Sequence, residues 1–256
     1  MYSSDVRQRA LALIDSGSSL RAVSMATGIS RPTLRDWRDH REKVFRSRAC
    51  CPRCCSSPAL PDPRADYAHL LGLYLGDGCI SVGGDPAKGV WKLRIMCADA
   101  WPGLIQECIR AMQAVRPASK VMTQQKQGCT EVTSYSRHWP CLFPQHGPGK
   151  KHLRRISLEP WQQTIVDEFP GLFVRGLFHS DGWRGSNRVR RVLDDREHWY
   201  EYPRYIFTNE SQDILQLCGE ALDRIGVDWR FSRPDNISVA RREAVARLDE
   251  YVGPKY

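Results

Sequence analysis

The stretch LLGLYLGDG at residues 70–78 decides the fold of this chain, because a related stretch, VRGLFHSDG, returns at residues 174–182. Both copies carry Gly-Leu in the middle and a small residue, Asp and Gly at the end. All of these positions align at one constant offset along the chain. A constant offset over this pattern indicates two copies of a single structural unit.

Both stretches are predicted to form buried helices. Leucine and tyrosine surround nearly the whole first helix, which is typical of a helix without a solvent face. Gly72 and Gly76 lie one helical turn apart, as do Gly176 and Ser180. Small residues at this spacing let two helix backbones approach closely. Since glycine inside a helix costs about 1 kcal/mol against alanine, we expect the two helices to offset that cost by packing together.

Asp77 and Asp181 stand at the ends of these helices, each before a glycine that can end a helix. A carboxylate there meets the negative end of the helix dipole, and a symmetric pair would bring both carboxylates together. Such a pair requires protonation or a cation. Oxygen ligands favour Mg²⁺ or Mn²⁺, which would suit hydrolysis of a phosphodiester bond. The alternative is two buried caps hydrogen-bonded to nearby backbone.

The two stretches resemble the dodecapeptide motif of LAGLIDADG homing endonucleases, in the single-chain form with two motifs. The resemblance implies an α+β fold in which each copy is αββαββα and the motif helices form the central interface. The sheets would then form a saddle over the DNA major groove. It also implies that Asp77 and Asp181 bind the catalytic metals, with backbone carbonyls added by Gly76 and Ser180.

The chain departs from the motif in a few places. Leu75 and His179 occupy the earlier acidic position, and Arg175 replaces a small residue in the second copy. Members of the family often place a lysine near the metal site. Lys151 is our first expectation for this role and Lys92 the alternative. The equivalent late position in the second copy is Arg241 or Arg242.

The remaining segments alternate between predicted strands and helices. Strands are expected at 79–82, 91–97, 131–136 and 156–158 in copy one and at 205–208 and 237–240 in copy two. Helices are expected from Pro102, over 211–225, and up to about Tyr251. Cations on the strands and in basic loops are expected to contact DNA, with phosphates as the main partners of the loop at 184–191. These expected DNA contacts are Lys92, Arg94, Lys150, Arg184 and Arg188. A solvated charged face is the alternative for any one of them.

Residues 4–40 are predicted to form three short helices. Ser19 and Ser30 can cap the second and third, and Pro32 suits a first helical turn. The pattern resembles the helix-turn-helix of resolvases and transposases. The third helix would offer DNA a basic side made of Arg31, Thr33, Arg35 and Arg38. The alternative is a plain three-helix bundle. We therefore expect a helix-turn-helix module at 1–45, a linker at 46–64, and repeats at 65–165 and 166–256.

The linker contains the cysteine cluster of the chain. Cys51 and Cys54 have the spacing of a zinc ligand pair, but structural zinc needs four ligands and the segment supplies one clear pair. A reduced turn without zinc is therefore the favoured interpretation. The six scattered cysteines are expected to be small buried hydrophobic residues.

Charge and composition limit the classes of function. The formal net charge is +9 over 256 residues, which favours a polyanionic partner such as double-stranded DNA. No apolar run is long enough to span a bilayer, and no leader segment is evident, so we expect a cytoplasmic protein. Two motifs in one chain favour a monomer. Two functions stay open: a metal-dependent, site-specific DNA endonuclease, and a DNA-binding regulator built on a degenerate copy of the same fold.

Overall fold

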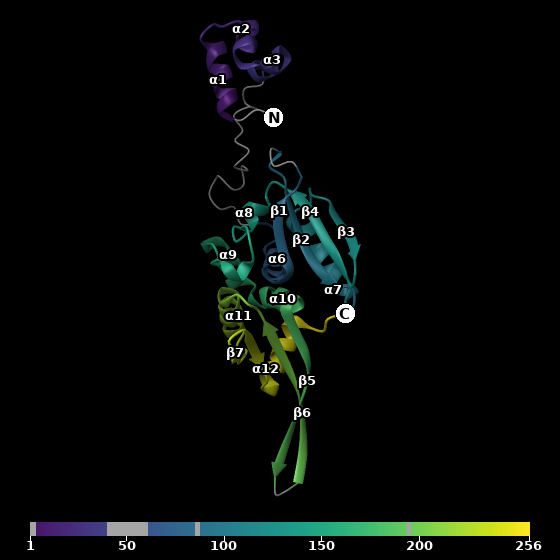
Figure 1. Cartoon of the computed structure of the whole chain (residues 1–256). Coiled ribbons are helices and arrows are strands. Elements are labelled where there is room, and N and C mark those ends of the chain that lie inside the picture. The colour runs from purple at the N-terminus through teal and green to yellow at the C-terminus, as the bar shows by residue number, and fades with distance from the viewer. Residues whose placement is uncertain (1–3, 40–60, 85–87, 194–195) are drawn as a thin grey trace.

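A computed structural model describes residues 4–39, 61–84, 88–193 and 196–256 (Figure 1). Cys51 and Cys54 lie outside the described residues. Within the described part of the chain, no helix combines the length and the apolar character needed to cross a membrane.

The N-terminal segment forms three helices, α1 (Ser4–Asp15), α2 (Leu20–Thr27) and α3 (Arg31–Asp39). The Ser19 hydroxyl accepts a hydrogen bond from the Ala22 amide at 3.2 Å, so the expected cap of α2 is present. Gly28 ends this helix with a φ of +69°, a conformation that favours glycine. The helices share a small core of their own, made of Ala10, Leu11, Val23, Ile29, Leu34 and Trp37. The three-helix arrangement therefore agrees with the sequence pattern.

The remainder of the chain is α+β and is built from two copies of one unit. Copy one runs α6 (Arg64–Asp77), β1 (Gly78–Val82), β2 (Trp91–Ala98), α7 (Pro102–Val115), β3 (Val121–Lys126) and β4 (Cys129–Ser136). Short helices α8 (Trp139–Leu142) and α9 (Pro160–Glu168), and the 3₁₀ turn Lys151–Leu153, follow. Copy two runs α10 (Pro170–Asp181), β5 (Gly182–Leu193), β6 (Arg196–Thr208), α11 (Gln212–Arg224), β7 (Arg230–Arg233), β8 (Asn236–Val239) and α12 (Arg242–Val252).

The two sheets have the same topology. Their strand orders are β1-β2-β4-β3 and β5-β6-β8-β7, and all neighbours are antiparallel. One face of each sheet carries buried apolar residues that pack under helices, such as Leu93 and Ile95 in copy one and Phe207 and Ile237 in copy two. The repeated order is what two copies of one structural unit require.

Helices α6 and α10 pack against each other at the centre of this body (Figure 1). A Cβ atom built on Gly72 would lie 2.8 Å from the Leu177 amide nitrogen and 2.9 Å from the Gly176 Cα atom. A Cβ on Gly176 would lie equally close to the Leu73 nitrogen, at 2.8 Å. Because the neighbours are backbone atoms, no side-chain rotation could relieve these contacts. The glycines therefore permit the close helix packing expected from their spacing.

Several elements differ from the sequence predictions. Residues 156–158 form no strand; the Ile156 amide instead donates to Asp213 Oδ2 at 2.7 Å. The basic residues of 184–191 lie on strand β5 rather than in a loop, because β5 and β6 form a long paired ribbon. Strands β3 and β7 were not predicted. Both are edge strands whose side chains are mostly exposed, so they lack the alternation of a half-buried strand.

Candidate functional site

Asp77 and Asp181 are the last residues of α6 and α10, and they meet where the two helices end. A Cβ atom on Gly76 would lie 3.1 Å from Asp181 Oδ2, so the second carboxylate reaches the end of the first helix. Gly78 follows with an extended backbone (φ −85°), and its Cβ would lie 2.7 Å from the Tyr74 carbonyl oxygen. The glycine after the aspartate ends the helix, as expected from the sequence, and it allows the close approach of the Tyr74 backbone.

Both carboxylates bind protons more tightly than an ordinary aspartate. Asp77 is exposed at the rim, yet desolvation by the protein on its inner side, followed by the charge of Asp181, raises its pKa to about 6. Burial also raises the pKa of Asp181, and a hydrogen bond from Asn209 Nδ2 to Asp181 Oδ2 at 2.8 Å opposes that shift. The pair is therefore a site of excess negative charge that favours a proton or a cation.

Lys151 lies against the C-terminal end of α6. Its ammonium donates to the carbonyl oxygens of Tyr74, Leu75 and Gly76 at 2.6, 2.7 and 2.5 Å. These three bonds use all three donors of the ammonium group, and they neutralise the negative end of the helix dipole. Burial lowers the pKa of Lys151 to about 8, while Asp181 and Asp77 act in the opposite direction.

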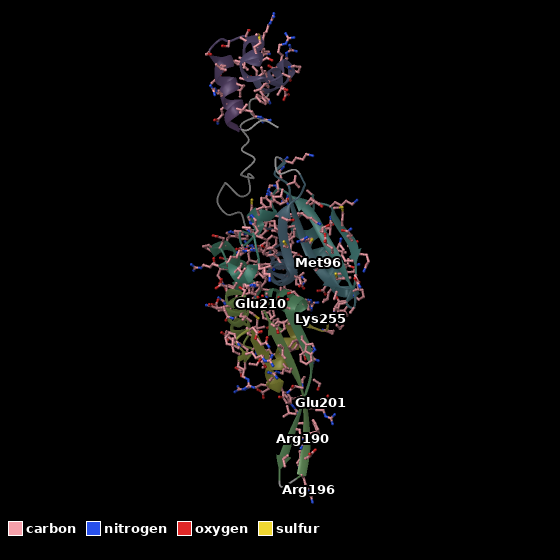
Figure 2. The ribbon with its side chains drawn as sticks, viewed as in Figure 1. Met96, Arg190, Arg196, Glu201, Glu210 and Lys255 are labelled. Atoms are coloured by element: carbon pink, nitrogen blue, oxygen red, sulfur yellow. The ribbon has the colours of Figure 1, made fainter. Side chains whose placement is uncertain are left out.

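Lys255 lies at the corresponding end of α10, and sequence reasoning missed it. Its ammonium donates to the Gly182 carbonyl oxygen at 2.6 Å and to that of Ser180 at 3.4 Å. Figure 2 shows Lys255 at the middle of the two-copy body. Burial lowers its pKa, and the Asp77 and Asp181 charges oppose that shift. A lysine in a short segment after the last helix carries no periodic signal, so only the fold places it here.

The expected cations of copy two lie elsewhere. Arg241 is exposed and pairs with Asp228 Oδ2 at 2.6 Å, and Arg242 begins α12. Lys92, the alternative lysine of copy one, pairs with Glu131 at 2.5 Å on the sheet. Of the basic residues considered for the two helix ends, Lys151 is therefore the one that the structure brings there.

A cavity of about 530 Å³ opens beside the two helix ends. Its walls come from both copies, including Gly76, Lys151 and Asp181. The basic loop that includes Gly149 and Lys150 forms one side. Arg154 stabilises this loop by donating to the Gly147 and Gly149 carbonyl oxygens at 3.0 and 2.9 Å. The motif ends and the Pro/Gly loop, which are far apart in sequence, thus line one open space.

The expected DNA contacts occupy different environments. Arg94, Lys150 and Arg188 are exposed. Arg184 is exposed as well, and its guanidinium donates to both oxygens of Asp249 on α12 at 2.6 and 2.8 Å. On α3, Arg31, Arg35 and Arg38 are exposed, with Arg38 paired to Asp39 at 2.8 Å; Thr33 is half-buried, and its hydroxyl bonds the Ser30 hydroxyl at 2.7 Å.

The ribbon of β5 and β6 carries aromatic residues that sequence reasoning did not single out. The ribbon extends well beyond the other strands of its sheet, and Arg190 and Arg196 lie along its outer part (Figure 2). Trp199 and Tyr200 are exposed there, at 53% and 44% of their surface. The Arg188 guanidinium lies over the Trp199 ring, 4.4 Å from its centre. Exposed arginine side chains of this kind suit a polyanionic partner.

Among the comparisons with known proteins, only the comparison with solved structures found similar proteins. No family model and no curated protein sequence matches the chain. Among solved structures, mesophilic variants of the homing endonuclease I-DmoI share 16% identity, with a TM-score of 0.47 over 75% of this chain and 97% of that one. I-DmoI in complex with DNA and Mn shares 15% identity, with a TM-score of 0.47 over 75% and 99%. The N-terminal LAGLIDADG domain of DUF199/WhiA shares 13%, with a TM-score of 0.41 over 75% and 83%. The solved structures similar to this chain thus include LAGLIDADG proteins, both homing endonucleases and a WhiA domain.

Proposed function

We propose that this chain is a site-specific, metal-dependent endonuclease that hydrolyses phosphodiester bonds of double-stranded DNA. The observation that carries the proposal is the meeting of Asp77 and Asp181 at the ends of two glycine-packed helices, one from each copy. Each carboxylate belongs to an equivalent place in its repeat, which suits a duplex whose two strands must both be cut. Asp181 and the end of the first motif helix, at Gly76 and Gly78, line a cavity with a basic wall.

The residues present fit a divalent ion such as Mg²⁺ or Mn²⁺. The donors are carboxylate oxygens, which these hard cations prefer, and the pKa of each aspartate is raised above its ordinary value. Backbone oxygens of Gly76 and Ser180 lie at the same helix ends, but they accept hydrogen bonds from Lys151 and Lys255, so the two carboxylates would be the main ligands. When bound, the ion would supply Lewis-acid stabilisation of the oxygens that gain charge during hydrolysis.

The remaining side chains would hold these groups in place. Lys151 and Lys255 each fix the end of one motif helix through backbone carbonyl oxygens, and both bring positive charge near the pair. Asn209 orients Asp181 through its 2.8 Å hydrogen bond. In this geometry Lys151 has its three donors engaged, so we assign it charge compensation rather than proton abstraction.

The DNA surface would consist of the open sheet faces, the β5–β6 ribbon and the N-terminal module at 1–45. Arg94, Arg188 and Lys150 are exposed, and the formal net charge of +9 supports contact with phosphates. We propose that α3 adds affinity as part of a helix-turn-helix, through its exposed arginines. A tethered second module raises the effective concentration at a neighbouring site. Both motifs lie in one chain, which supports action as a monomer.

The test is cleavage of a supercoiled plasmid that carries the DNA flanking the gene for this chain. We expect nicked and linear products with Mg²⁺ or Mn²⁺ and none with a chelator. Asp77→Asn and Asp181→Asn should each reduce cleavage by at least about 100-fold, because each removes a charged ligand. Glu220→Gln on α11 is the matched control, since its side-chain carboxylate accepts only from Gln216 of its own helix among the contacts described.

The result that would refute the proposal is tight binding of the same DNA, independent of metal and unaffected by Asp77→Asn, with no cleavage. That outcome would favour the second hypothesis, a DNA-binding regulator that uses this fold without catalysis. Unchanged cleavage in the Asp77→Asn, Asp181→Asn double variant would also refute the assignment of the site.

A further inference from the structure

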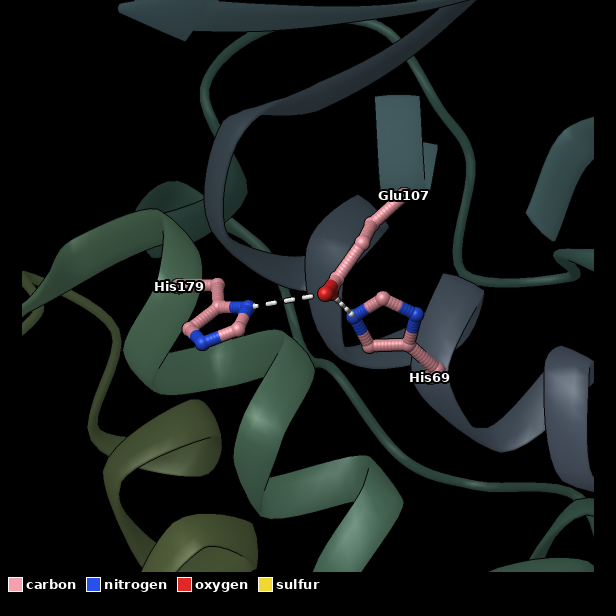
Figure 3. A group of neighbouring side chains, drawn as sticks. All are labelled: His69, Glu107 and His179. Carbon is pink, nitrogen blue, oxygen red and sulfur yellow. Dashed lines mark ion pairs between the residues drawn. The ribbon is translucent and has the colours of Figure 1, made fainter. Parts of the chain in front are cut away.

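Three buried side chains with metal-binding atoms meet on the far side of the motif helices from the aspartates. His69 comes from α6, Glu107 from α7 and His179 from α10, and both imidazole rings point at the Glu107 carboxylate (Figure 3). Their exposed fractions are 9%, 8% and 5%. His179 and Asp181 are two positions apart on one helix, so they face nearly opposite sides. This cluster is therefore separate from the proposed catalytic pair.

Two nitrogens of the cluster lack hydrogen bonds. His69 Nε2 and His179 Nδ1 are both buried, and neither has a hydrogen-bond partner among the described residues. The other nitrogen of His179 bonds the Val252 carbonyl oxygen at 2.9 Å, which holds the ring with Nδ1 toward Glu107. Metal-binding histidines are commonly oriented in this way by a backbone carbonyl. A buried nitrogen without a partner costs free energy, and a bound ion would remove that cost.

The distances are close to those of a tetrahedral zinc site. Glu107 Oε2 lies 3.8 Å from His69 Nε2 and 3.5 Å from His179 Nδ1, and the three ligand atoms lie within 4.8 Å of one another. Zinc bonds of about 2.0–2.1 Å set the edges of a tetrahedron at about 3.3 Å. The two separations from Glu107 exceed this edge by about 0.5 and 0.2 Å, and the two histidine nitrogens, within 4.8 Å of each other, would close on the ion by side-chain rotation. We propose that His69, Glu107 and His179 bind a zinc ion that joins the two copies.

The surroundings of Glu107 support this assignment. Arg175 Nη2 and the Tyr256 hydroxyl each donate to Oε1 at 2.6 Å. Oε2 accepts one longer bond, from Arg175 Nε at 3.2 Å, and is the oxygen turned to the histidines. Burial alone would raise the pKa of Glu107, but the neighbouring His179 ring and the hydrogen bonds from Arg175 and Tyr256 outweigh it and lower the pKa. The carboxylate is therefore charged. Burial lowers the pKa of His69 to about 4, which leaves a neutral ring at pH 7.

The chemistry selects the ion and leaves room for a fourth ligand. Two imidazole nitrogens favour zinc over magnesium, so this site and the aspartate pair would take different metals. Arg175 already balances the charge of Glu107, which further disfavours a hard cation that depends on charge alone. A cavity of about 270 Å³ lined by His69, Glu107 and Arg175 reaches the cluster and admits a water molecule.

The proposed zinc site explains both positions at which the second copy differs from the LAGLIDADG motif. Arg175 and His179 are the residues that differ from the motif in copy two, and both contact Glu107. His69 precedes the repeated stretch of copy one and supplies the third side chain. The ion would link three helices from both copies, so we infer a structural role for it.

The experiment uses the full chain with Cys50, Cys51, Cys54 and Cys55 replaced by serine, which removes zinc binding by the linker. The protein is stripped with a chelator, supplied with zinc, passed through a desalting column and analysed for bound metal. We expect one equivalent of zinc and a raised unfolding temperature, as mass action predicts for an ion that binds only the folded state. X-ray absorption should show nitrogen and oxygen neighbours without sulfur.

Variants separate this site from the aspartate pair. His69→Gln and His179→Gln should weaken zinc binding at least tenfold, whereas the Asp77→Asn, Asp181→Asn double variant should retain one equivalent. Absence of bound zinc in the serine-substituted chain would overturn the proposal. Unchanged zinc affinity in both histidine variants would overturn it as well. The absorption spectrum of the serine-substituted chain decides the ligands even if a histidine variant fails to fold.

Discussion

Replacing Asp77 by asparagine should stabilise the metal-free protein at neutral pH, although it should abolish cleavage. The pKa of Asp77 is raised from 3.8 to about 6 by desolvation on its inner side and by the Asp181 charge. Between these two values the native state keeps a proton that the unfolded chain has released. The free energy of unfolding therefore falls as pH rises through this window, and the full penalty is present above about pH 7. Asparagine carries no charge, so the variant does not lose this free energy of unfolding at high pH.

The size of the effect follows from the same two values. Their difference corresponds to about 3 kcal/mol if the site were dry. Asp77 is exposed, however, and solvent screens its interaction with Asp181, so we expect the variant to gain about 1 kcal/mol at pH 8. Below about pH 3 both carboxylates are largely protonated in the native and the unfolded state, and the gain should vanish.

The assay is urea denaturation from about pH 2.5 to pH 8 with a chelator present. Asp249→Asn is the matched control with the opposite sign. Hydrogen bonds from Arg184 and Tyr205 lower the pKa of Asp249, so this variant should lose stability at pH 7 and approach the parent as pH falls. Mg²⁺ should then stabilise the parent and not Asp77→Asn. A loss of stability in Asp77→Asn at pH 8, or a gain independent of pH, would refute the reasoning.

Three further predictions concern packing, DNA and charge. Gly176→Ala should cost about 2 kcal/mol by urea denaturation, because its Cβ would lie 2.9 Å from the Gly72 Cα; an unchanged midpoint would contradict the close helix contact. Arg188→Ala on the ribbon should weaken DNA binding and reduce the slope of log K against log salt by about 1, whereas Arg224→Ala, whose guanidinium pairs with Asp167 on α9, should leave the slope unchanged. Lys255→Met removes a positive charge near the aspartates, so it should shift the acidic limb of the pH profile of cleavage upward by about one pH unit. Lys255→Arg should restore the limb, and equal pH profiles for the parent and Lys255→Met would exclude charge compensation by Lys255.

The repeat and its consequences could be predicted from local patterns. Glycines one turn apart in two apolar stretches predicted a close helix pair, and the Gly72 and Gly176 contacts have that form. Helix-ending aspartates predicted a crowded acidic pair, and desolvation and the mutual charge of Asp77 and Asp181 now account for a raised pKa. The caps of the N-terminal helices also lie within a few residues of the atoms they bind, so the chain itself specifies them.

Edge strands and long-range contacts could not be predicted in this way. Strands β3 and β7 expose most of their side chains, so no alternation marks them, and their existence depends on pairing with β4 and β8. The length of the β5–β6 ribbon similarly depends on backbone pairing between two polar segments. Backbone hydrogen bonds leave little trace in side-chain patterns.

The sequence by itself determined the two-copy plan, the helix ends that carry Asp77 and Asp181, and the helices of the N-terminal segment. Each of these features depends on residues a few positions apart in the sequence. A helix brings residues at that spacing onto one face, where they contact each other or a neighbouring helix. Only the tertiary structure decided that Lys255 reaches the end of α10 and that His69, Glu107 and His179 meet. These residues are brought together by the packing of separate helices and by the chain after α12. Such contacts depend on the whole fold, and no local spacing encodes them.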